Sequence, residues 1–472
     1  MASRVSKRAL GRASIEWNGG GNRLKPTVTA TLPASLAEAG IHSRQVACLS
    51  KRIRPEDIPL PVTDLCRTLS RHGYRGWVVG GCLRDLLRGQ PASDWDLATD
   101  ARPEQVQAIF PRVIPTGIQH GTVTVRHRGL SYELTTLRGE GAYSDGRRPD
   151  SVEFVSDIRA DLGRRDFTIN ALAYDPVADQ LEDPHGGLAD LALGLIRAVG
   201  EPTLRFGEDG LRVLRAARFA ASLEFELEAQ TEAAIRPTLD TFRRVSPERV
   251  REEWVKALKA REPSRAFAVM RRTGILEVTF AALFQLSESA WSASLCAVDG
   301  APVELCVRLA ALLFPLRAAP QELTQWLTQY RFSNAERERI ARLVELALPT
   351  ESKAWTDTDV RRYARRAGRA ALPDLAALSV VLARAHHGAD SEPLRAAHDL
   401  CARIDALVRP ETPLSTKELA LDGRALMQQL GIQPGPRVGK LLDALLERVL
   451  LDPPLNTRER LLDTARTLDA EE

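Results

Sequence analysis

A glycine pair between a short apolar segment and a helical segment constrains this chain more than any other feature. Residues 74–79 have the pattern of a short apolar strand, and Gly80-Gly81 interrupts it. Residues 82–88 then have helical character. Glycine lets the backbone approach a phosphate closely, and the start of a helix favours an anion. The pattern therefore predicts a strand, a glycine turn and a helix arranged around an anionic ligand.

Two aspartates with one residue between them, Asp94 and Asp96, follow this helix. Side chains alternate across a strand, so we expect a second strand to present both carboxylates to one spot. Mg²⁺ takes oxygen ligands and keeps water and substrate phosphate in its shell. An Asp-x-Asp alone is more typical of a solvated turn or a helix cap. The glycine turn, and Arg84 as a fork for phosphate oxygens, favour metal-assisted handling of a triphosphate.

Composition places the chain among ordinary proteins with several domains. Its 472 residues suit two to four domains, and 44% are hydrophobic and 27% charged. A net charge of +3 neither requires nor excludes a nucleic-acid partner. The sequence has no apolar run long enough to span a bilayer. Its six cysteines are scattered without metal-ligand spacing, which favours free thiols in a reducing, cytoplasmic setting.

Periodicity divides the chain into a mixed front and a helical remainder. Residues 1–45 are weakly patterned and predict a flexible extension. Up to about residue 195 strands and helices alternate, including strands at 121–125 and 130–136 around a turn at Arg128-Gly129. After residue 196 the pattern is helical almost throughout. The fold class expected is α+β, with a small mixed sheet followed by an all-α region.

A second cluster lies in residues 164–172, where Arg165 and Asp166 stand side by side. On this stretch alone the simplest interpretation is that Asp166 caps a helix while the arginines are solvated. Such a cap is compatible with a binding role, so both interpretations stay open at this point.

A third cluster contains Asp209, Arg212, Arg215 and Arg218. On a helix Asp209 and Arg212 are neighbours three residues apart, and together they offer acceptors and donors to the edge of a base. Arg215 follows one turn on, whereas Arg218 lies about half a helical circumference from Asp209. An ordinary surface ion pair between Asp209 and Arg212 is the alternative, and the cluster alone favours that alternative.

Taken together, the clusters resemble the class II tRNA nucleotidyltransferase and bacterial poly(A) polymerase family. Gly-Gly-x-x-Arg-Asp with Asp-x-Asp resembles its catalytic motif, residues 164–172 its ribose motif, and residues 208–212 its base-selecting motif. Residues 183–187 with Asp190 resemble its connecting motif. Residues 246–250 with Glu252 are similar to the neck helix that braces the nucleotide pocket.

The resemblance implies template-independent addition of CCA to the 3′ end of tRNA from CTP and ATP. It implies that Asp94 and Asp96 hold Mg²⁺ while the RNA 3′-hydroxyl attacks the α-phosphate and pyrophosphate leaves. Glu133 is either a third carboxylate near the metals or a structural residue. The implied nucleotide contacts are Gly81 and Arg84 for the triphosphate, Arg165 and Asp166 for ribose and phosphates, Asp209 and Arg212 for the base, and Arg215 and Arg218 for the pocket lining.

Five segments follow from the resemblance. They are an extension (1–45), a catalytic head (46–195), a neck with the nucleotide-selecting helix (196–260), a helical body (261–400) and an RNA-binding tail (401–472), in which Arg437 and Lys440 suit phosphate contacts. An ordinary turn between helices is the alternative at that point of the tail. His386, His387 and His398 lack the spacing of an appended metal phosphohydrolase and are expected to be solvated.

Several functions remain as alternatives. Residues 120–125 look like the tRNA-directed enzymes rather than the poly(A) polymerases, and residues 140–149 look like the flexible loop that CC-adding members lack. Addition of A alone, or poly(A) tailing, is therefore the alternative activity. A catalytically silent RNA-binding protein is the alternative of another class, and the intact Asp94–Asp96 pair disfavours it. The sequence leaves the oligomeric state open.

Overall fold

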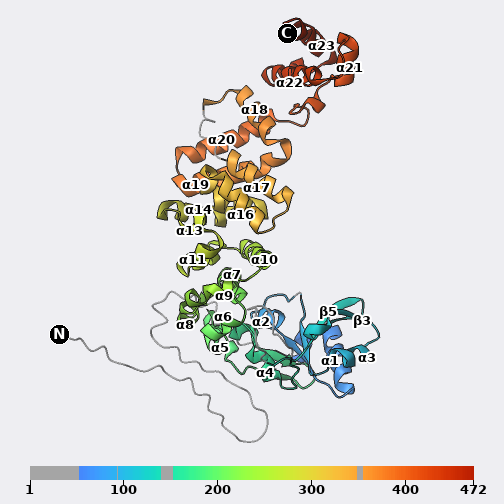
Figure 1. Ribbon diagram of the computed structural model, residues 1–472, viewed down its shortest axis with the longest axis vertical. Helices are drawn as coiled ribbons and strands as arrows, with labels where there is room; N and C mark the ends of the chain where they lie inside the picture. The colour runs from blue at the N-terminus through green and yellow to red at the C-terminus, as the bar shows by residue number, and fades with distance from the viewer. Residues whose placement is uncertain (1–52, 93, 140–152, 348–353, 472) are drawn as a thin grey trace, which may run out of the picture. The chain divides into compact units, whose positions relative to one another are not determined.

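Within the described part of the chain, a mixed sheet with its helices comes first and a helical region follows (Figure 1). The computed structural model describes residues 53–92, 94–139, 153–347 and 354–471. The expected extension at 1–45 and the expected loop at 140–149 lie outside these ranges. The α+β class is confirmed, and no helix in the described ranges is long and apolar enough to cross a membrane.

Seven strands form the sheet in the order β3-β4-β5-β2-β1-β6-β7. The pair β2–β5 is parallel and the other neighbouring pairs are antiparallel. β8 and β9 make a separate parallel pair. The strands are β1 (Gly76–Val79), β2 (Leu97–Thr99), β3 (Val113–Gly117), β4 (Thr122–His127), β5 (Leu130–Thr136), β6 (Ala173–Asp175), β7 (Gln180–Glu182), β8 (Leu195–Ile196) and β9 (Glu226–Leu227).

The predicted hairpin at 121–136 is confirmed as β4 and β5. Val123, Val125, Tyr132 and Leu134 are buried, and alternate residues face outward, as expected for a sheet with one covered face. Arg128 and Gly129 both have positive φ, at 48° and 82°. This is the conformation that a two-residue turn requires between twisted antiparallel strands.

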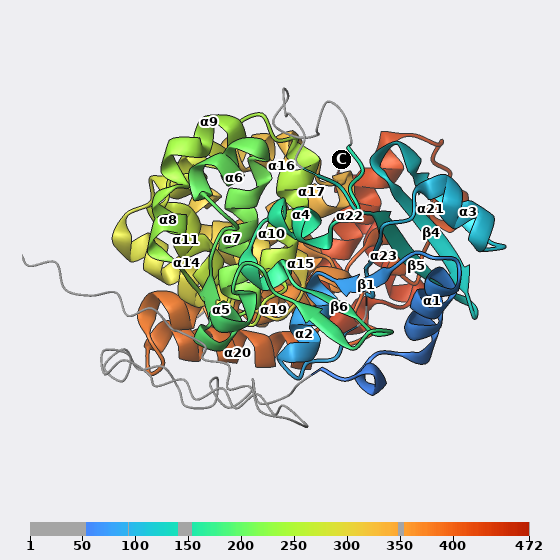
Figure 2. The same cartoon turned by 90° about the horizontal axis from the view of Figure 1, so that it is seen from below.

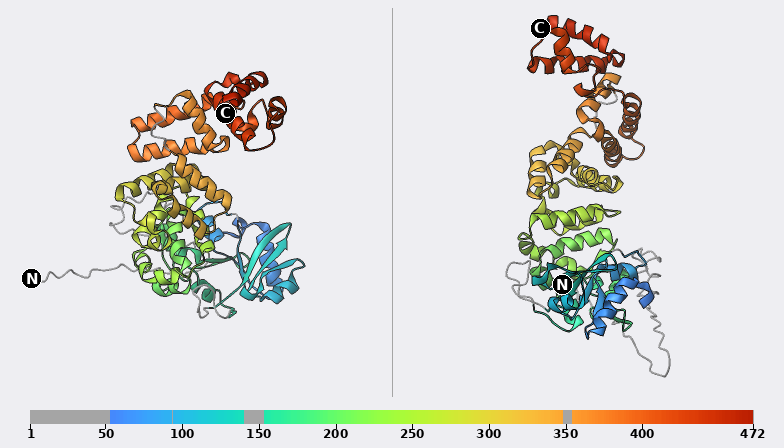
Figure 3. Two further views of the ribbon diagram at one scale, coloured as in Figure 1. Left: turned by 45° about the horizontal axis from the view of Figure 1, so that its top comes forward. Right: turned by 90° about the vertical axis from the view of Figure 1, so that its right-hand side faces the viewer.

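The helices surround and extend this sheet. α1 packs against β1 (Figure 2), and from α10 onward the described chain contains helices without strands (Figure 3). The helices up to α10 are α1 (Leu60–Arg71), α2 (Gly81–Leu87), α3 (Pro103–Ile109), α4 (Ile158–Gly163), α5 (Gly187–Leu193), α6 (Pro202–Glu208), α7 (Leu211–Ser222), α8 (Ala229–Ala233), α9 (Leu239–Phe242) and α10 (Pro247–Leu258).

Beyond α10 the helices form one continuous apolar core with the preceding ones. Trp254 of α10 lies against Phe267 and Trp326, with ring centroids 5.0 and 4.9 Å apart. The remaining helices are α11 (Ser264–Arg272), α12 (Ile275–Thr279), α13 (Ala281–Phe284), α14 (Glu288–Gly300), α15 (Leu305–Leu313), α16 (Pro320–Gln329), α17 (Asn334–Leu346), α18 (Asp357–Ala367), α19 (Leu372–His387), α20 (Glu392–Leu407), α21 (Gly423–Leu430), α22 (Pro436–Leu451) and α23 (Arg458–Glu471).

Candidate functional site

The two aspartates lie just before β2 rather than within it. The expectation that a strand carries both is wrong, because β2 begins at Leu97. The Val79 amide still donates to the Asp96 carbonyl at 3.1 Å, but pairing ends there. The residue opposite the next position would be Gly80, whose φ of +80° turns the chain into α2. Both aspartates are solvent-exposed at the end of the strand pair.

The glycine turn brings Asp96 and Arg165 close to the same point. A Cβ atom at Gly80 would lie 3.4 Å from Nη1 of Arg165 and 3.6 Å from Oδ2 of Asp96. The strand, turn and helix therefore form as predicted. They place a carboxylate and a guanidinium beside the bare backbone of the turn.

Negative charge gathers around Asp96. Partial desolvation raises the pKa of Asp96, Glu133 and Asp94 raise it further by their charge, and Arg165 acts in the opposite direction. Glu133 precedes Leu134, which pairs with Leu97 in the parallel ladder, so it lies beside Asp96 across the strands. The described residues contain no group of three or more His, Cys, Asp or Glu side chains that could hold a metal ion.

Arg84 of α2 is buried and fully engaged with neighbouring groups. Its Nε and Nη2 donate to the two carboxylate oxygens of Asp85, each at 2.9 Å. Its Nη1 donates to Oδ1 of Asn170 at 2.7 Å. The guanidinium lies beneath the turn, because a Cβ atom at Gly81 would be 3.3 Å from its Nη2.

Asp166 is a buried anion and does not cap an α-helix. The segment that follows is a 3-10 turn at Thr168–Asn170, so the cap interpretation is wrong. Its Oδ1 accepts from the Phe167 amide at 2.8 Å and from Nδ2 of Asn170 at 3.1 Å, and its Oδ2 accepts from Nε of Arg215 at 2.8 Å. Burial would raise the pKa of Asp166, but Arg215 and the hydrogen bond from Asn170 hold it well below the usual range.

Asp209 and Arg212 are not neighbours on one helix face, contrary to our expectation. α6 ends at Glu208, Asp209 is extended, and α7 starts at Leu211. The Asp209 carboxylate accepts from the Leu211 amide at 3.0 Å and from Nη2 of Arg249 at 2.7 Å.

Arg212 is instead held by the end of α6. It donates to Glu208 at 2.5 Å and to the carbonyls of Arg205 and Arg164 at 2.7 and 2.9 Å. The break between the helices has a steric cause, because a Cβ atom at Gly210 would lie 2.5 Å from Cα of Phe242. Only a glycine lets the start of α7 approach α9 so closely.

Arg215 and Arg218 of the third cluster, together with Arg84 of α2, surround one aromatic ring. The guanidiniums of Arg84, Arg215 and Arg218 lie 5.4, 5.4 and 3.8 Å from the centroid of Phe219. Arg218 also pairs with Glu253 of α10, a side chain 2% exposed. α7 and α10 pack together, so the helix that resembles the family's neck helix lies against this cluster. The residue that does so is Glu253 rather than Glu252, which is exposed.

The connecting motif joins the head to this cluster through two aspartates. Asp183 accepts from the amides of Gly187 and Leu188 at 2.6 and 3.0 Å. Asp190 accepts from the Thr168 hydroxyl at 2.7 Å. These bonds fix the turn at Gly186, whose φ is +73°, against the segment that contains Asp166.

Sequence reasoning missed three residues of this site: Asn170, Phe219 and Glu253. Asn170 connects to Arg84 across 86 positions, and Glu253 connects to Arg218 across 35. The sequence around each residue does not indicate either of these two contacts. The available signal was that Asn170 lies in the same motif as Asp166, residues 164–172, and that Phe219 directly follows Arg218.

The comparisons with known proteins agree with one another. Three families match the chain: the Poly A polymerase head domain over residues 76–197, a probable RNA and SrmB- binding site of polymerase A over 224–286, and a putative tRNA nucleotidyltransferase domain 2 over 307–465. The CCA-adding enzyme of Geobacillus thermodenitrificans (strain NG80-2) is 36% identical over 424 residues, which covers 85% of this chain and 96% of that enzyme. The chain belongs to the CCA-adding enzyme family.

Other CCA-adding enzymes support this assignment. The enzyme of Lactobacillus johnsonii is 35% identical over 385 residues, covering 81% of this chain and 91% of that enzyme. The Bacillus stearothermophilus CCA-adding enzyme, solved in complex with CTP, matches with a TM-score of 0.71 at 30% identity and covers 88% of this chain and 100% of that one. The Thermotoga maritima enzyme complexed with tRNA_CCA shares the fold, with a TM-score of 0.62 at 22% identity, covering 90% and 98%.

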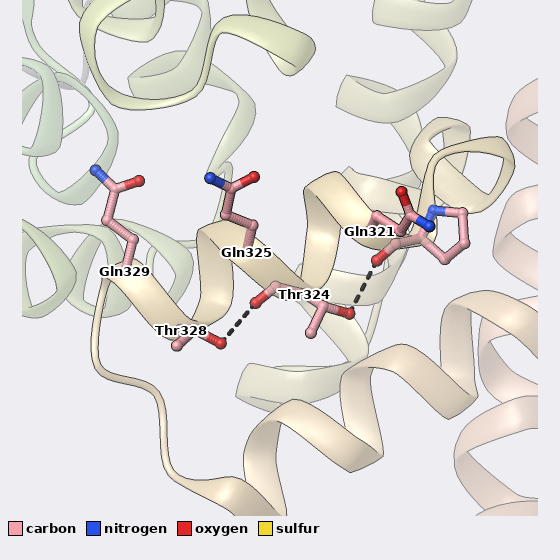
Figure 4. A pocket seen from close by; sticks show the side chains of 6 residues that line it. Gln321, Thr324, Gln325, Thr328 and Gln329 are labelled. Carbon is pink, nitrogen blue, oxygen red and sulfur yellow. Dashed lines mark hydrogen bonds between the residues drawn. The ribbon is translucent and has the colours of Figure 1, made fainter.

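The helical part of this CCA-adding enzyme family member carries other expected features. Arg437 pairs with Asp469 at 2.6 Å, while Lys440 is exposed. His386, His387 and His398 are exposed on α19 and α20, so the prediction of solvated histidines is confirmed. One hollow of about 750 Å³ lies along α16, where Gln321, Gln325 and Gln329 project together (Figure 4). None of the residues of the candidate site lines it.

Proposed function

We propose that this protein adds CCA to the 3′ end of tRNA, with CTP and ATP as substrates. The observation that carries the proposal is the pair Asp94 and Asp96 beside the Gly80 turn, next to a cluster of arginines that leads to α7. Related CCA-adding enzymes have been solved in complex with CTP, with ATP and with tRNA_CCA.

The two aspartates fit a divalent metal, and we take Mg²⁺ as the ion. Both carboxylates are exposed, and partial desolvation together with the charges of Glu133 and Asp94 raises the pKa of Asp96, so a cation there would be favoured. When bound, the metal would lower the pKa of the attacking hydroxyl and stabilise charge on the phosphates. Asp94 and Asp96 would hold it, with water and phosphate oxygens completing its shell.

The phosphate end of the nucleotide belongs at the glycine turn. Gly81 exposes backbone there, and Arg84 and Arg165 bring two guanidiniums to the same turn. The RNA 3′-hydroxyl then attacks the α-phosphate in line and pyrophosphate leaves, which requires positive groups around the departing oxygens. Asp166 is buried and holds the segment beside Arg165, and the ribose contact is assigned to this segment.

The base end belongs at the junction of α6 and α7. Asp209 is half-buried, and Arg249 and the Leu211 amide orient its carboxylate. Three acceptors fix the guanidinium of Arg212, which would supply hydrogen-bond donors to the base. Arg215 and Arg218 pack against Phe219 and would line the nucleotide pocket. A base edge is therefore read by protein groups whose positions are set before the nucleotide binds.

Two contacts support the proposed segment boundaries. Arg249 and Glu253 of α10 pair with Asp209, which lies between α6 and α7, and with Arg218 of α7, which argues for one neck unit over residues 196–260. The proposed head at 46–195 then contains Asp94 and Asp96. The helical segments 261–400 and 401–472 are the proposed body and tail, which would bind tRNA.

The test supplies purified protein with tRNAs ending at the discriminator base, at C and at CC, with CTP and ATP separately and together. The proposal expects CMP to be added to the first two and AMP to the third. Growth only on the CC-ending tRNA would indicate an A-adding enzyme, and long tails on unrelated RNA would indicate a poly(A) polymerase.

The metal carboxylates are tested with Asp94→Ala and Asp96→Ala. Each variant should lose nucleotide incorporation and retain tRNA binding, measured by filter binding. Retained turnover in both variants would contradict the assignment of the reaction centre. Retained turnover with no change in Mg²⁺ dependence would contradict the metal site as well.

A further inference from the structure

Asn170 lies between the phosphate end and the base end of the candidate site. Its Oδ1 accepts from Nη1 of Arg84 at 2.7 Å, and its Nδ2 donates to Oδ1 of Asp166 at 3.1 Å. The other oxygen of Asp166 accepts from Nε of Arg215 at 2.8 Å. A chain of hydrogen bonds thus runs from Arg84 on α2 to Arg215 on α7.

The amide of Asn170 has one orientation that satisfies both neighbours. An arginine can only donate, and an ionised carboxylate can only accept. The amide oxygen must therefore face Arg84 while the amide nitrogen faces Asp166. Asn170 is 6% exposed and Asp166 and Arg84 are each 8% exposed, so water does not readily replace either bond.

The two arginines at the ends of this chain also share one ring. Arg84 and Arg215 each lie 5.4 Å from the centroid of Phe219, and Arg218 lies at 3.8 Å. Three guanidiniums around one ring repel one another unless anions separate them. Asp85, Asp166 and Glu253 supply those anions, and Asp166 is the one that Asn170 connects to Arg84.

We propose that Asn170 is a positioning residue that couples the phosphate-side Arg84 to the base-side Arg215 through Asp166. The proposal rests on the proposed function, because it assigns Arg84 and Arg215 to the nucleotide. When Arg84 moves toward a triphosphate, its hydrogen bond to the Asn170 amide changes and the amide shifts. The hydrogen bond from Asn170 to Asp166 and the ion pair between Asp166 and Arg215 then shift as well. Binding at the phosphate end therefore helps to set the base-reading geometry.

Two substitutions separate this relay from simpler roles. Asn170→Leu keeps the approximate shape and removes both bonds. Asn170→Asp keeps an acceptor for Arg84 but removes the donor to Asp166 and places two carboxylates face to face. A residue that only holds Arg84 would tolerate Asn170→Asp, whereas the relay would not.

Thr273→Val is the matched control. Thr273 is the C-cap of α11, away from the candidate site, and is 4% exposed, and its hydroxyl donates to the Val269 carbonyl at 2.7 Å. The substitution removes one buried hydrogen bond without touching Arg84, Asp166 or Arg215. Its effect measures what a general loss of stability does to turnover.

Steady-state kinetics with CTP and with ATP provide the readout, normalised to the amount of folded protein. Because a hydrogen bond to a charged group contributes about 1.5–3 kcal/mol, both Asn170 variants should raise KM and lower kcat/KM by about 10- to 100-fold. Thr273→Val should change KM by less than about twofold. Near-normal KM and kcat in Asn170→Asp would overturn the relay.

A double substitution tests the coupling itself. Arg84→Lys combined with Asn170→Leu should be little worse than either alone, because both break the same chain. Multiplicative losses would overturn the proposal. Equilibrium binding of labelled CTP without tRNA is measured for the same variants. Loss of CTP affinity in both Asn170 variants would support the relay even if the wild-type protein failed to extend tRNA, an outcome that would refute the proposed function alone.

Discussion

The charge of Asp96 depends on the carboxylates around it. Partial desolvation and the charges of Glu133 and Asp94 raise its pKa, so it gains a proton at a higher pH than an ordinary aspartate does. A protonated Asp96 cannot hold a cation, so activity should fall as pH drops through that pKa. Glu133→Gln removes one raising charge and should move the acid limb of kcat/KM to lower pH.

The measurement is the pH profile of CMP incorporation for wild type and Glu133→Gln. Glu338→Gln, at an exposed carboxyl on α17, is the control and should leave the acid limb in place. An acid limb that stays in place in Glu133→Gln would mean that Glu133 does not act on Asp96. Complete loss of activity would instead favour a direct metal-binding role for Glu133.

Residue identities were predictable where a motif is local, and residue partners were not. Asp94, Asp96 and Arg84 could be named as candidates from their spacing, whereas Asp166 could be named only through the resemblance to a family, because its local pattern suggested a helix cap. The partner of Asp209 could not, because Arg249 lies 40 positions away on a helix whose docking is a tertiary property. Such links depend on how helices pack, and no window of local sequence contains that information.

At the scale of elements, Gly210 decides how α6 meets α7. A Cβ atom there would lie 2.5 Å from Cα of Phe242, so Gly210→Ala must push α7 away from α9. We expect a loss of about 1–3 kcal/mol in the free energy of unfolding, as for other overpacked sites. We also expect a higher KM for CTP, because Asp209 sits at the same junction.

Gly207 offers the matched control for this prediction. It lies within α6, and a Cβ atom there would meet nothing within 4 Å. Gly207→Ala should stabilise the protein by about 0.5–1 kcal/mol, because alanine has less backbone freedom to lose. Urea denaturation of both variants gives the comparison. Equal effects of the two substitutions would show that contact with Phe242 does not govern the junction.

The ion pair between α7 and α10 is a second feature at this scale. Glu253 is 2% exposed and pairs with Arg218 and Lys256, so Glu253→Gln leaves a mostly buried guanidinium without its anion. We expect a loss of about 3–5 kcal/mol in unfolding free energy. Replacing both partners, with Glu253→Leu and Arg218→Met, should recover much of it. Stability that falls further in the double variant would contradict this account.

Strands in which apolar and polar residues alternate could be predicted from the sequence. Helix ends that are set by contact with a distant element could not. The β4–β5 hairpin follows from alternating apolar residues and from Arg128-Gly129, which suits a tight turn. The break at Asp209 was hidden, because residues 202–222 have helical character on both sides of it. Contact with α9 fixes that break, and α9 lies outside the local pattern.

At the scale of the whole molecule, the neck must be joined to the body so that the carboxylate and arginine on α10 keep their positions. Arg308 of α15 makes this join. It is 3% exposed and donates to the carbonyls of Leu258 and Ala260, at the end of α10, and to the carbonyl of Ala301 at 3.3 Å. A planar guanidinium can reach several carbonyls at once, which an ammonium on a flexible stem cannot.

Arg308→Met should therefore loosen the neck helix from the body. Buried carbonyls lose their donor at about 1–3 kcal/mol each, partly offset because a buried charge is also removed, so we expect a net loss of about 2–4 kcal/mol. Urea unfolding followed by tryptophan fluorescence suits this test, because Trp254 lies on α10. Arg308→Lys should recover little of the loss.

Hydrogen exchange then locates the effect. If Arg308 fastens α10, its amides should exchange faster in Arg308→Met while those of the sheet keep their protection. KM for both nucleotides should rise in parallel, because Arg249 and Glu253 hold Asp209 and Arg218 from that helix. Uniformly faster exchange across the sheet and α10 would mean that Arg308 supports global stability only. In that case the neck would keep its place on the body through the aromatic packing of Trp254 with Phe267 and Trp326.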